Sequence, residues 1–230
     1  PLLFGRSEER TYSFSGLARS HSAPLEEDSS PQENSPHALP LGSATGQILH
    51  KIFEHIFQAG IHCPLDEKRL SSVIDQAIHL TPLEPFRSLL LPWMKDLLAL
   101  PIAGFSLSQI PADQLQQEME FHFPLEHSLK GIMKGFADLF FECNGKYYLL
   151  DWKSNYLGAS DADYTQEKLV LAMQGNDYFL QAAIYKDALA RYVKLFDKRP
   201  FEEIFGGAIY YFIRGKAFLL FNPAQLEELI

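Results

Sequence analysis

Two apolar segments on either side of Asn144-Gly145 constrain the fold of this chain more than any other feature. Asn-Gly is the strongest short hairpin signal in a sequence, because both central residues of a type I′ turn require a positive φ. The segments it joins, residues 135–142 and 146–153, are apolar on both faces. Strands of this kind are covered on both sides, usually in an α/β protein. We therefore expect a central hairpin between layers of helices.

The hairpin brings two carboxylates together. With a two-residue turn Cys143 faces Lys146, and counting back along both strands puts Asp138 opposite Asp151. Lys153 lies on the same face, since side chains alternate with a period of two. Opposed Cβ atoms are about 4.5–5.5 Å apart, and like charges there are unfavourable without a cation between them. A β-bulge would shift this register. The pattern predicts a metal site; the alternative is a buried ion pair between Lys153 and one Asp.

The ligand types favour a hard cation. Carboxylate and carbonyl oxygens suit Mg²⁺, Mn²⁺ or Ca²⁺, whereas a zinc site would usually recruit His or Cys. Mg²⁺ keeps several waters, which leaves room for phosphate oxygens of a substrate. A lysine beside the carboxylates can hold the attacking water or stabilise developing negative charge. This combination is suited to phosphodiester hydrolysis.

At these residues the chain resembles a known family. Asp138 followed by Asp151-Trp152-Lys153 resembles the D…(D/E)xK signature of the PD-(D/E)xK restriction-endonuclease-like nucleases. The longer strings 130–138 and 148–158 resemble the C-terminal nuclease domain of RecB subunits (exonuclease V beta chain) of RecBCD helicase–nucleases. One minor departure is Ala137, which replaces Pro before the first Asp. The resemblance implies an α/β fold in which a mixed β-sheet core is flanked by helices.

The resemblance also implies roles for residues outside the hairpin. His50 and Glu118 match further metal ligands, with Glu120 the less favoured choice at the second position. The backbone carbonyl of Trp152 would add an oxygen. The implied cofactor is Mg²⁺, with Mn²⁺ able to substitute. The implied catalytic set is Asp138, Asp151, Lys153 and Glu118.

A second implied motif lies on an expected helix over residues 177–194. Gln181 and Tyr185 match the Gln-x-x-x-Tyr pattern of the same nucleases and lie one helical turn apart. The functional interpretation puts both near DNA as substrate contacts or as groups that orient the carboxylates. The alternative is that both side chains pack in the core and their polar groups hydrogen-bond to the backbone. Asn155, in a loop after Lys153, is a further substrate-binding candidate on position alone.

Other helices are expected over residues 68–80, 84–98 and about 164–174. His50 lies on an amphipathic helix for which Thr45 is the expected N-cap. Gly46, one turn before His50, would let another backbone or a substrate come close. A lone His on an apolar helix is more often a core residue than a ligand, so its ligand role rests on the resemblance.

Composition sets outer limits. A chain of 230 residues with 47% hydrophobic content can bury one sizeable core, so residues 1–230 are expected to form a single nuclease domain. Residues 20–40 are rich in Ser, Pro and Glu and predict a flexible segment. No apolar run is long enough to span a bilayer. Cys63 and Cys143 cannot by themselves hold an iron–sulfur cluster, and nothing suggests a disulfide, which fits a bacterial cytoplasmic protein.

The formal net charge of −9 counts against a nucleic-acid role, because DNA affinity usually comes from Lys and Arg contacts to phosphates. We therefore expect weak, salt-sensitive DNA binding by this chain alone. It begins at Pro1 and contains no G-x-x-x-x-G-K-[ST] phosphate loop, so we expect it to be part of a longer chain that carries the ATP-driven motor elsewhere.

The resemblance implies helicase domains in the same native chain and RecC- and RecD-like partner subunits. The expected function is Mg²⁺-dependent hydrolysis of mainly single-stranded DNA during double-strand break repair and recombination. Two alternatives stay open: a catalytically silent nuclease-like assembly or regulatory module, and a hydrolase acting on another phosphoester such as a nucleotide.

Overall fold

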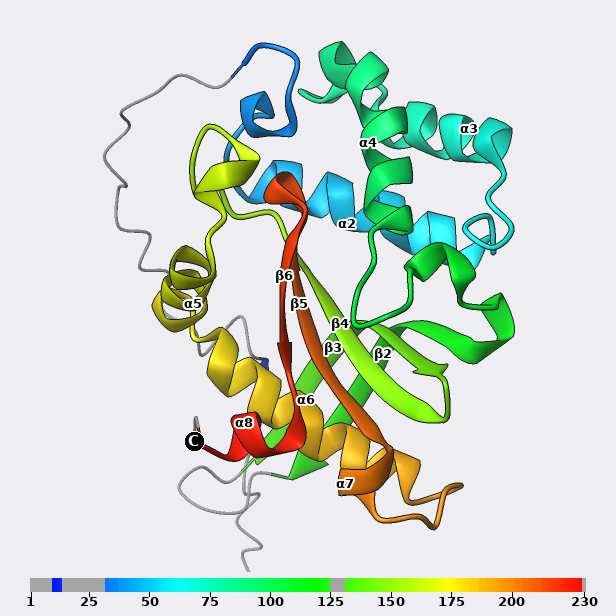
Figure 1. Cartoon of the computed structure of the whole chain (residues 1–230), viewed down its shortest axis with the longest axis vertical. Helices are drawn as coiled ribbons and strands as arrows, with labels where there is room; N and C mark the ends of the chain where they lie inside the picture. The colour runs from blue at the N-terminus through cyan, green and yellow to red at the C-terminus, as the bar shows by residue number, and fades with distance from the viewer. Residues whose placement is uncertain (1–9, 14–31, 125–130, 229–230) are drawn as a thin grey trace, which may run out of the picture.

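A mixed β-sheet forms the centre of the protein (Figure 1). The computed structural model describes residues 10–13, 32–124 and 131–228, and within these the sheet has six strands. The strands are β1 (Arg10–Ser13), β2 (Leu115–Pro124), β3 (Gly131–Cys143), β4 (Lys146–Lys153), β5 (Phe205–Phe212) and β6 (Ala217–Phe221). The order is β1-β3-β4-β5-β6, with β2 also paired to β3. The β1–β3 and β4–β5 pairs are parallel and the others antiparallel, which confirms the expected mixed sheet.

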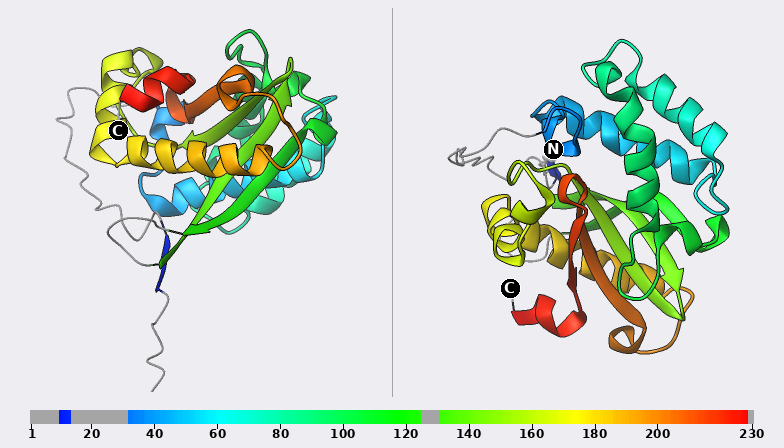
Figure 2. Two further views of the ribbon diagram at one scale, coloured as in Figure 1. Left: turned by 90° about the horizontal axis from the view of Figure 1, so that it is seen from below. Right: turned by 45° about the horizontal axis from the view of Figure 1, so that its top comes forward.

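Helices cover both faces of the sheet (Figure 2). One face carries α2 (Ser43–Gln58), α3 (Glu67–Ile78) and α4 (Arg87–Ala99), and the other carries α5 (Gln166–Gly175) and α6 (Tyr178–Val193). The short helix α7 (Phe201–Ile204) precedes β5, and the short helix α8 (Pro223–Glu228) follows β6. None of the helices in the described ranges has the length and apolar character needed to cross a membrane.

The hairpin of β3 and β4 forms as expected. Cys143 pairs with Lys146 and Leu139 with Leu150, and both Asn144 and Gly145 have positive φ, 53° and 76°. Alternation along β4 separates the two cores: Leu150 packs under α2–α4, whereas Leu149 packs under α6. A strand with apolar side chains on both faces is therefore buried on both faces, as its sequence predicts.

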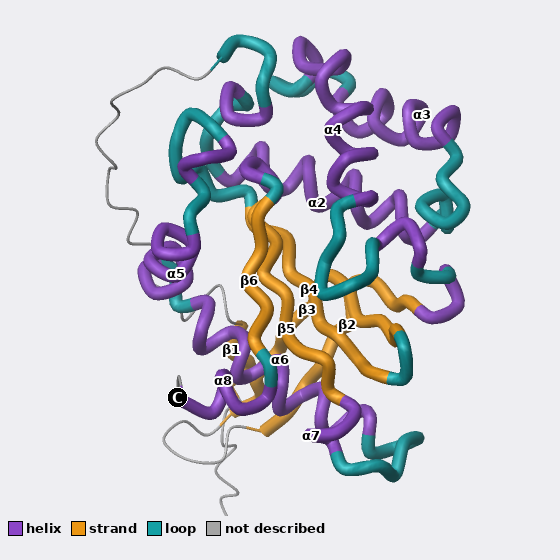
Figure 3. The backbone as a smooth tube through the Cα atoms, viewed as in Figure 1, coloured by secondary structure: helices purple, strands orange, loops and turns teal. Residues whose placement is uncertain are grey.

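The two edges of β3 are used differently (Figure 3). β2 runs along one edge from residue 132 to residue 141 of β3. On the opposite edge, β1 pairs with residues 131–134 and β4 with residues 139–143. Counted from the turn, the pairing of β3 with β4 runs from Cys143↔Lys146 to Leu139↔Leu150 and stops there, so Asp138 is the first residue of β3 beyond it. We call this position, where β4 leaves β3, the fork.

The expected helices form, with starts and ends that differ from the expected positions by one to three residues. The segment expected over 177–194 is α6, and that expected over 68–80 is α3. The expectation that Thr45 caps α2 is wrong: the helix begins at Ser43, after Gly42 with φ 107°. Helix α5 begins two residues later than expected, because the side chain of Thr165 accepts the Lys168 N–H and caps it.

Residues 20–31 of the expected flexible segment 20–40 lie outside the described residues, whereas residues 32–40 are described. Pro36–Ala38 form a 3₁₀ turn, and Leu39 is buried. The side chain of Arg214, which is 1% exposed, donates to the carbonyl oxygens of Pro36, Leu39 and Pro40 at 2.9–3.0 Å. Arg214 therefore satisfies backbone carbonyls of a segment whose Leu39 packs in the core.

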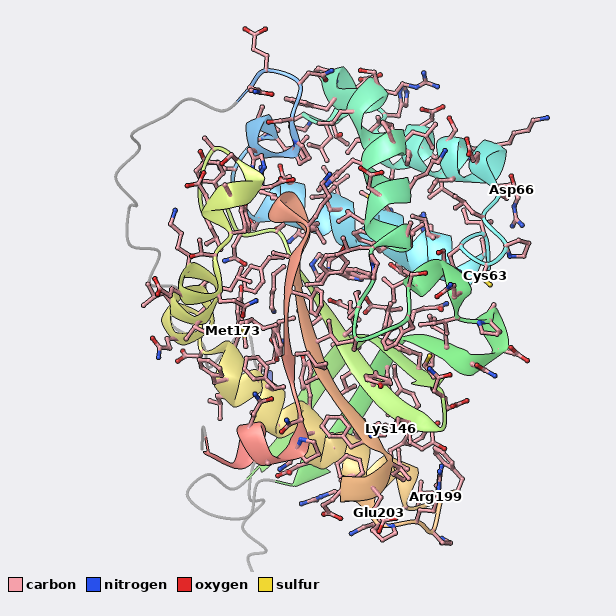
Figure 4. All side chains as sticks on the ribbon, viewed as in Figure 1. Cys63, Asp66, Lys146, Met173, Arg199 and Glu203 are labelled. Atoms are coloured by element: carbon pink, nitrogen blue, oxygen red, sulfur yellow. The ribbon has the colours of Figure 1, made fainter. Side chains whose placement is uncertain are left out.

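Cys63 and Cys143 have free thiols. Cys63 lies in the turn that follows α2, where Figure 4 labels it. Cys143 ends β3 at the hairpin.

Candidate active site

Asp138 lies at the fork and joins three elements. One carboxylate oxygen accepts the backbone N–H of Trp152 in β4 at 2.8 Å. The other oxygen lies 3.2 Å from Nδ1 of His50 in α2. A side-chain oxygen therefore takes the place of a strand carbonyl where the backbone ladder ends. This arrangement leaves the carboxylate at the surface of the fork, 13% exposed, rather than sealed in the sheet.

Asp151 and Lys153 form a buried ion pair on the α6 side of β4. Nζ of Lys153 lies 2.6 Å from Oδ2 of Asp151, and the two side chains are 8% and 10% exposed. Burial raises the pKa of Asp151; the positive charge of Lys153 offsets part of the rise and the negative charge of Asp138 adds to it. The ion pair considered as the alternative to a metal site is thus present. It leaves Asp138 paired with His50 rather than unpaired.

Glu118 lies across from Asp138 in the β2–β3 register. Gln117 pairs with Leu139 and Met119 with Ala137, and the intervening Glu118 has a left-handed φ of 47°. That conformation is costly for a residue other than glycine and recurs at functional sites. Burial raises the pKa of Glu118, as do the negative charges of Asp138 and Glu54. The structure therefore puts Glu118 within the electrostatic reach of the fork.

His50 reaches the fork from α2 because a small residue lets the helix approach β4. A Cβ added to Gly46 would lie 2.8 Å from Oγ of Ser154, the residue after Lys153. The close approach expected at Gly46 is therefore made by the chain itself. Burial lowers the pKa of His50, but attraction and hydrogen bonding to Asp138, together with Asp151, outweigh it and raise the pKa to about 8.

The donor set fits a hard divalent cation in its chemistry. Glu118, Asp138 and Asp151 supply carboxylates whose mutual repulsion contributes to the raised pKa values, and His50 adds an imidazole. Carboxylate oxygens are the ligands that Mg²⁺ and Mn²⁺ favour. In the part of the chain that the structure describes, these side chains engage one another, and no three His, Cys, Asp or Glu side chains converge as a metal cage would require. The ligand roles, including that of the Trp152 carbonyl, remain predictions.

Gln181 and Tyr185 lie behind the lysine, buried in α6. Oε1 of Gln181 accepts from Nζ of Lys153 at 3.0 Å, and its Nε2 donates to the Tyr185 hydroxyl at 2.9 Å. Both side chains are at most 7% exposed. The structure thus connects this pair to Lys153; direct contact with DNA remains a prediction. Asn155 lies in the loop after β4, where its side chain accepts from the Tyr178 hydroxyl at 3.4 Å.

Two aromatic residues of the site, Tyr178 and Tyr210, are not among the site residues predicted from the sequence. The ring of Tyr178 lies over Lys153, with Nζ 3.6 Å from the ring centroid, and the Tyr210 ring lies at 5.2 Å. The signal for Tyr178 was its place three residues before Gln181, which puts both on one face of the expected helix. No comparable local signal marks Tyr210, because its position depends on the pairing of β4 with β5.

Comparison with known proteins adds an independent observation. The family model described as the PD-(D/E)XK nuclease superfamily matches residues 24–228. The chain is similar to the RecBCD enzyme subunit RecB of Escherichia coli K12, with 34% identity over 210 residues, covering 78% of this chain and 17% of that protein. RecB of Haemophilus influenzae is 32% identical over 208 residues, covering 77% and 16%. RecB of Chlamydia pneumoniae is 34% identical over 163 residues, covering 69% and 15%.

The chain spans at most 17% of the length of these three relatives. The matched region nevertheless includes the hairpin, the fork and α6. The family match and the mixed sheet with its carboxylates and lysine at the fork agree with each other. The chain therefore belongs to the PD-(D/E)XK nuclease superfamily.

Proposed function

We propose that this chain is the nuclease domain of a RecB-like helicase–nuclease and hydrolyses phosphodiester bonds of DNA, mainly single-stranded, with Mg²⁺ as its cofactor. The observation that carries the proposal is the fork of a nuclease-superfamily chain, where Asp138 bonds to the backbone N–H of Trp152, the residue between the ion-paired Asp151 and Lys153. Mn²⁺ is expected to substitute for Mg²⁺, since both accept carboxylate oxygens.

Each residue of the fork has a role in the proposal. Asp138, Asp151 and Glu118 would hold the cation through oxygens, with His50 as a nitrogen ligand. When bound, a divalent cation supplies Lewis-acid stabilisation of the scissile phosphate. Lys153 would donate a hydrogen bond to the attacking water or to a phosphate oxygen as negative charge develops. Asp151 lies 2.6 Å from that ammonium and holds it at the fork.

Delivery of the DNA is assigned to partners. The net charge of −9 makes unaided capture of a polyanion weak. Helicase domains in the same native chain and RecC- and RecD-like subunits would feed unwound strands to the fork, in a bacterial cytoplasmic complex for double-strand break repair and recombination. The names of the RecB relatives support this assembly.

Cleavage of end-labelled single-stranded DNA by the purified chain tests the chemistry. The assay compares Mg²⁺, Mn²⁺ and EDTA, with Asp151→Ala as the site variant and Glu203→Ala as a matched control. Glu203 is an exposed carboxylate at the end of the sheet far from α2 (Figure 4). We expect metal-dependent cleavage that Asp151→Ala abolishes and Glu203→Ala retains. Cleavage by Asp151→Ala at the wild-type rate would refute the mechanism.

A Mn²⁺ titration by calorimetry separates a domain that needs its helicase from a catalytically silent module. Binding that depends on Asp138 and Asp151, without cleavage, would indicate missing delivery of DNA. Absence of both binding and cleavage would favour the silent module. Parallel assays on mononucleotide phosphoesters test the alternative of a hydrolase that acts on nucleotides, and we expect no turnover of these substrates.

A further inference from the structure

The ammonium of Lys153 is held on three sides. Asp151 lies 2.6 Å and the Gln181 amide oxygen 3.0 Å from Nζ, and the Tyr178 ring centroid lies 3.6 Å away. A lysine has three N–H donors, and a cation this close to an aromatic centroid is within the range of a cation–π interaction. The attraction is strongest where water is excluded, and the Lys153 side chain is only 8% exposed.

Tyr178 is itself fixed in place. It is the first residue of α6, directly after Asp177 with a left-handed φ of 56°. Its ring stacks on Tyr210 with centroids 6.0 Å apart and an interplanar angle of 25°. Its hydroxyl donates to Asn155 at 3.4 Å. Gln181 follows one turn later, so the first turn of α6 presents both a π face and an amide oxygen to Lys153.

We propose that Tyr178 is a positioning residue for Lys153, and that the face of its ring, rather than its hydroxyl, holds the ammonium at the fork. This inference rests on the proposed function, in which Lys153 donates to the reacting water or phosphate. Asp151 would also be a metal ligand, so its oxygens are shared between Lys153 and the cation. The ring of Tyr178 and the amide of Gln181 are not shared in this way and would keep Lys153 aligned.

Two substitutions distinguish the contribution of the Tyr178 ring from that of its hydroxyl. Tyr178→Phe keeps the π face and loses only the hydrogen bond to Asn155, which at 3.4 Å is long. Tyr178→Leu removes the π face. We expect Tyr178→Leu to lower kcat about 10- to 100-fold with KM little changed, since a displacement of about 1 Å at a reacting group costs about 100-fold. Tyr178→Phe should restore most of kcat.

A matched control excludes a general effect of losing an aromatic ring from α6. Phe179 is the next residue, and its ring packs against Phe221 at 5.5 Å, away from Lys153. Phe179→Leu should therefore leave kcat within about twofold. Phenylalanines of increasing fluorine content at position 178 provide a finer test, because fluorine weakens the negative face of the ring with little change in shape. The logarithm of kcat should fall steadily with fluorination; a flat series would overturn the proposal.

A double-mutant cycle in unfolding tests the contact without any activity. Tyr178→Leu and Lys153→Met are made singly and together, and unfolding is followed in urea with EDTA. We expect the two changes to couple by about fivefold to thirtyfold in the unfolding equilibrium constant. No coupling would overturn the proposal, as would a Tyr178→Phe enzyme as slow as Tyr178→Leu. If the two changes couple but the wild-type chain neither binds Mn²⁺ nor cleaves DNA, the result would support the contact and count against the proposed function.

Discussion

The carboxylate of Asp138 accepts the backbone N–H of Trp152 at 2.8 Å, so a side chain of β3 bonds to β4 just where the ladder between these strands ends. Trp152 is the residue between Asp151 and Lys153. The hydrogen bond therefore fixes the segment that carries both charged groups relative to Asp138. The same carboxylate lies 3.2 Å from His50, which extends the connection to α2. Asp138 thus has a structural role as well as its proposed ligand role.

Two substitutions at Asp138 should separate these roles. Asp138→Asn removes the charge but keeps an oxygen that can accept the Trp152 N–H, whereas Asp138→Ala removes both. We expect both variants to lose Mn²⁺ binding and DNA cleavage. Both variants also lose the charge pair with His50, but Asp138→Ala should be less stable than Asp138→Asn by about 1–3 kcal/mol, because a buried donor is left without a partner. Calorimetry and urea unfolding in EDTA measure the two effects; equal stability of the two variants would contradict the structural role.

Loss of Asp151 should destabilise the chain through the lysine that remains. Asp151→Ala leaves the Lys153 ammonium, 8% exposed, without its counter-charge. Breaking a buried ion pair in this way costs about 3–5 kcal/mol. The double variant Asp151→Ala/Lys153→Met removes both charges and should recover most of that stability. Urea unfolding in EDTA compares the three proteins, and a single variant as stable as the double one would argue against a strong ion pair.

The hairpin and its charged residues could be predicted because their geometry is local. Asn144 and Gly145 require positive φ, which sets the turn length, and the turn length sets the register between β3 and β4. That register puts Asp138 opposite Asp151, but in the structure the ladder ends one pair earlier, at Leu139↔Leu150, and Asp138 bonds to the Trp152 N–H instead. Lys153 follows from alternation along one strand.

Contacts between distant segments could not be predicted in this way. Arg214 bonds to Pro36 across 178 positions, a contact that no local pattern indicates. Tyr178 contacts Lys153 because α6 packs on the face of β4 that carries Lys153. Which face α6 covers depends on the packing of the whole sheet. Position 118 gave no sign of its left-handed φ, since Glu rarely adopts it. The family resemblance, not the residue pattern, pointed to His50 and Glu118.

The contact between α2 and the end of β4 should be sensitive to one methyl group. Gly46→Ala places a Cβ 2.8 Å from Oγ of Ser154 and should displace the loop that follows Lys153. In a Ser154→Ala background the nearest atom is the Ser154 Cβ position at 3.9 Å, which is an ordinary contact.

We therefore expect Gly46→Ala to slow cleavage severalfold in the wild-type background but not in Ser154→Ala. In that background it should also stabilise the chain by up to about 1 kcal/mol, because Ala is the better helix former. Cleavage rates and urea unfolding of the four proteins test both points. A loss of activity that persists in Ser154→Ala would show that the clash is not the cause.

Arg214 should hold residues 36–40 in place. Its guanidinium donates to Pro36, Leu39 and Pro40, and also to the Ser154 carbonyl at 2.9 Å. Arg214→Met leaves several buried carbonyl oxygens without a donor, at about 1–3 kcal/mol each. We expect faster amide hydrogen exchange at residues 36–40 and lower stability. Arg199→Met, whose parent Arg199 is exposed and pairs with Asp197, is the matched control and should leave exchange at residues 36–40 unchanged.

The protonation of His50 links metal binding to pH. Its pKa of about 8 lies above the ordinary value of 6.5, because Asp138 and Asp151 attract the proton more than burial disfavours it. In the metal-free chain the His50–Asp138 pair therefore stabilises the fold fully below pH 6.5, and this contribution is lost as pH rises through about 8. A metal ligand must be the neutral imidazole, so a cation has to displace this proton at pH 7.

We expect the Mn²⁺ association constant to rise by up to about fivefold between pH 7 and pH 8 and about tenfold by pH 9, where it levels off as one proton ceases to compete. Calorimetry in buffers of different ionisation enthalpy counts that proton directly. His50→Gln should bind Mn²⁺ more weakly and lose most of the pH dependence over this range. His79→Gln is the control, since His79 is an exposed histidine paired with Glu84 beyond α3, and it should keep the wild-type profile. A wild-type affinity independent of pH from 7 to 9 would mean that His50 is not a ligand.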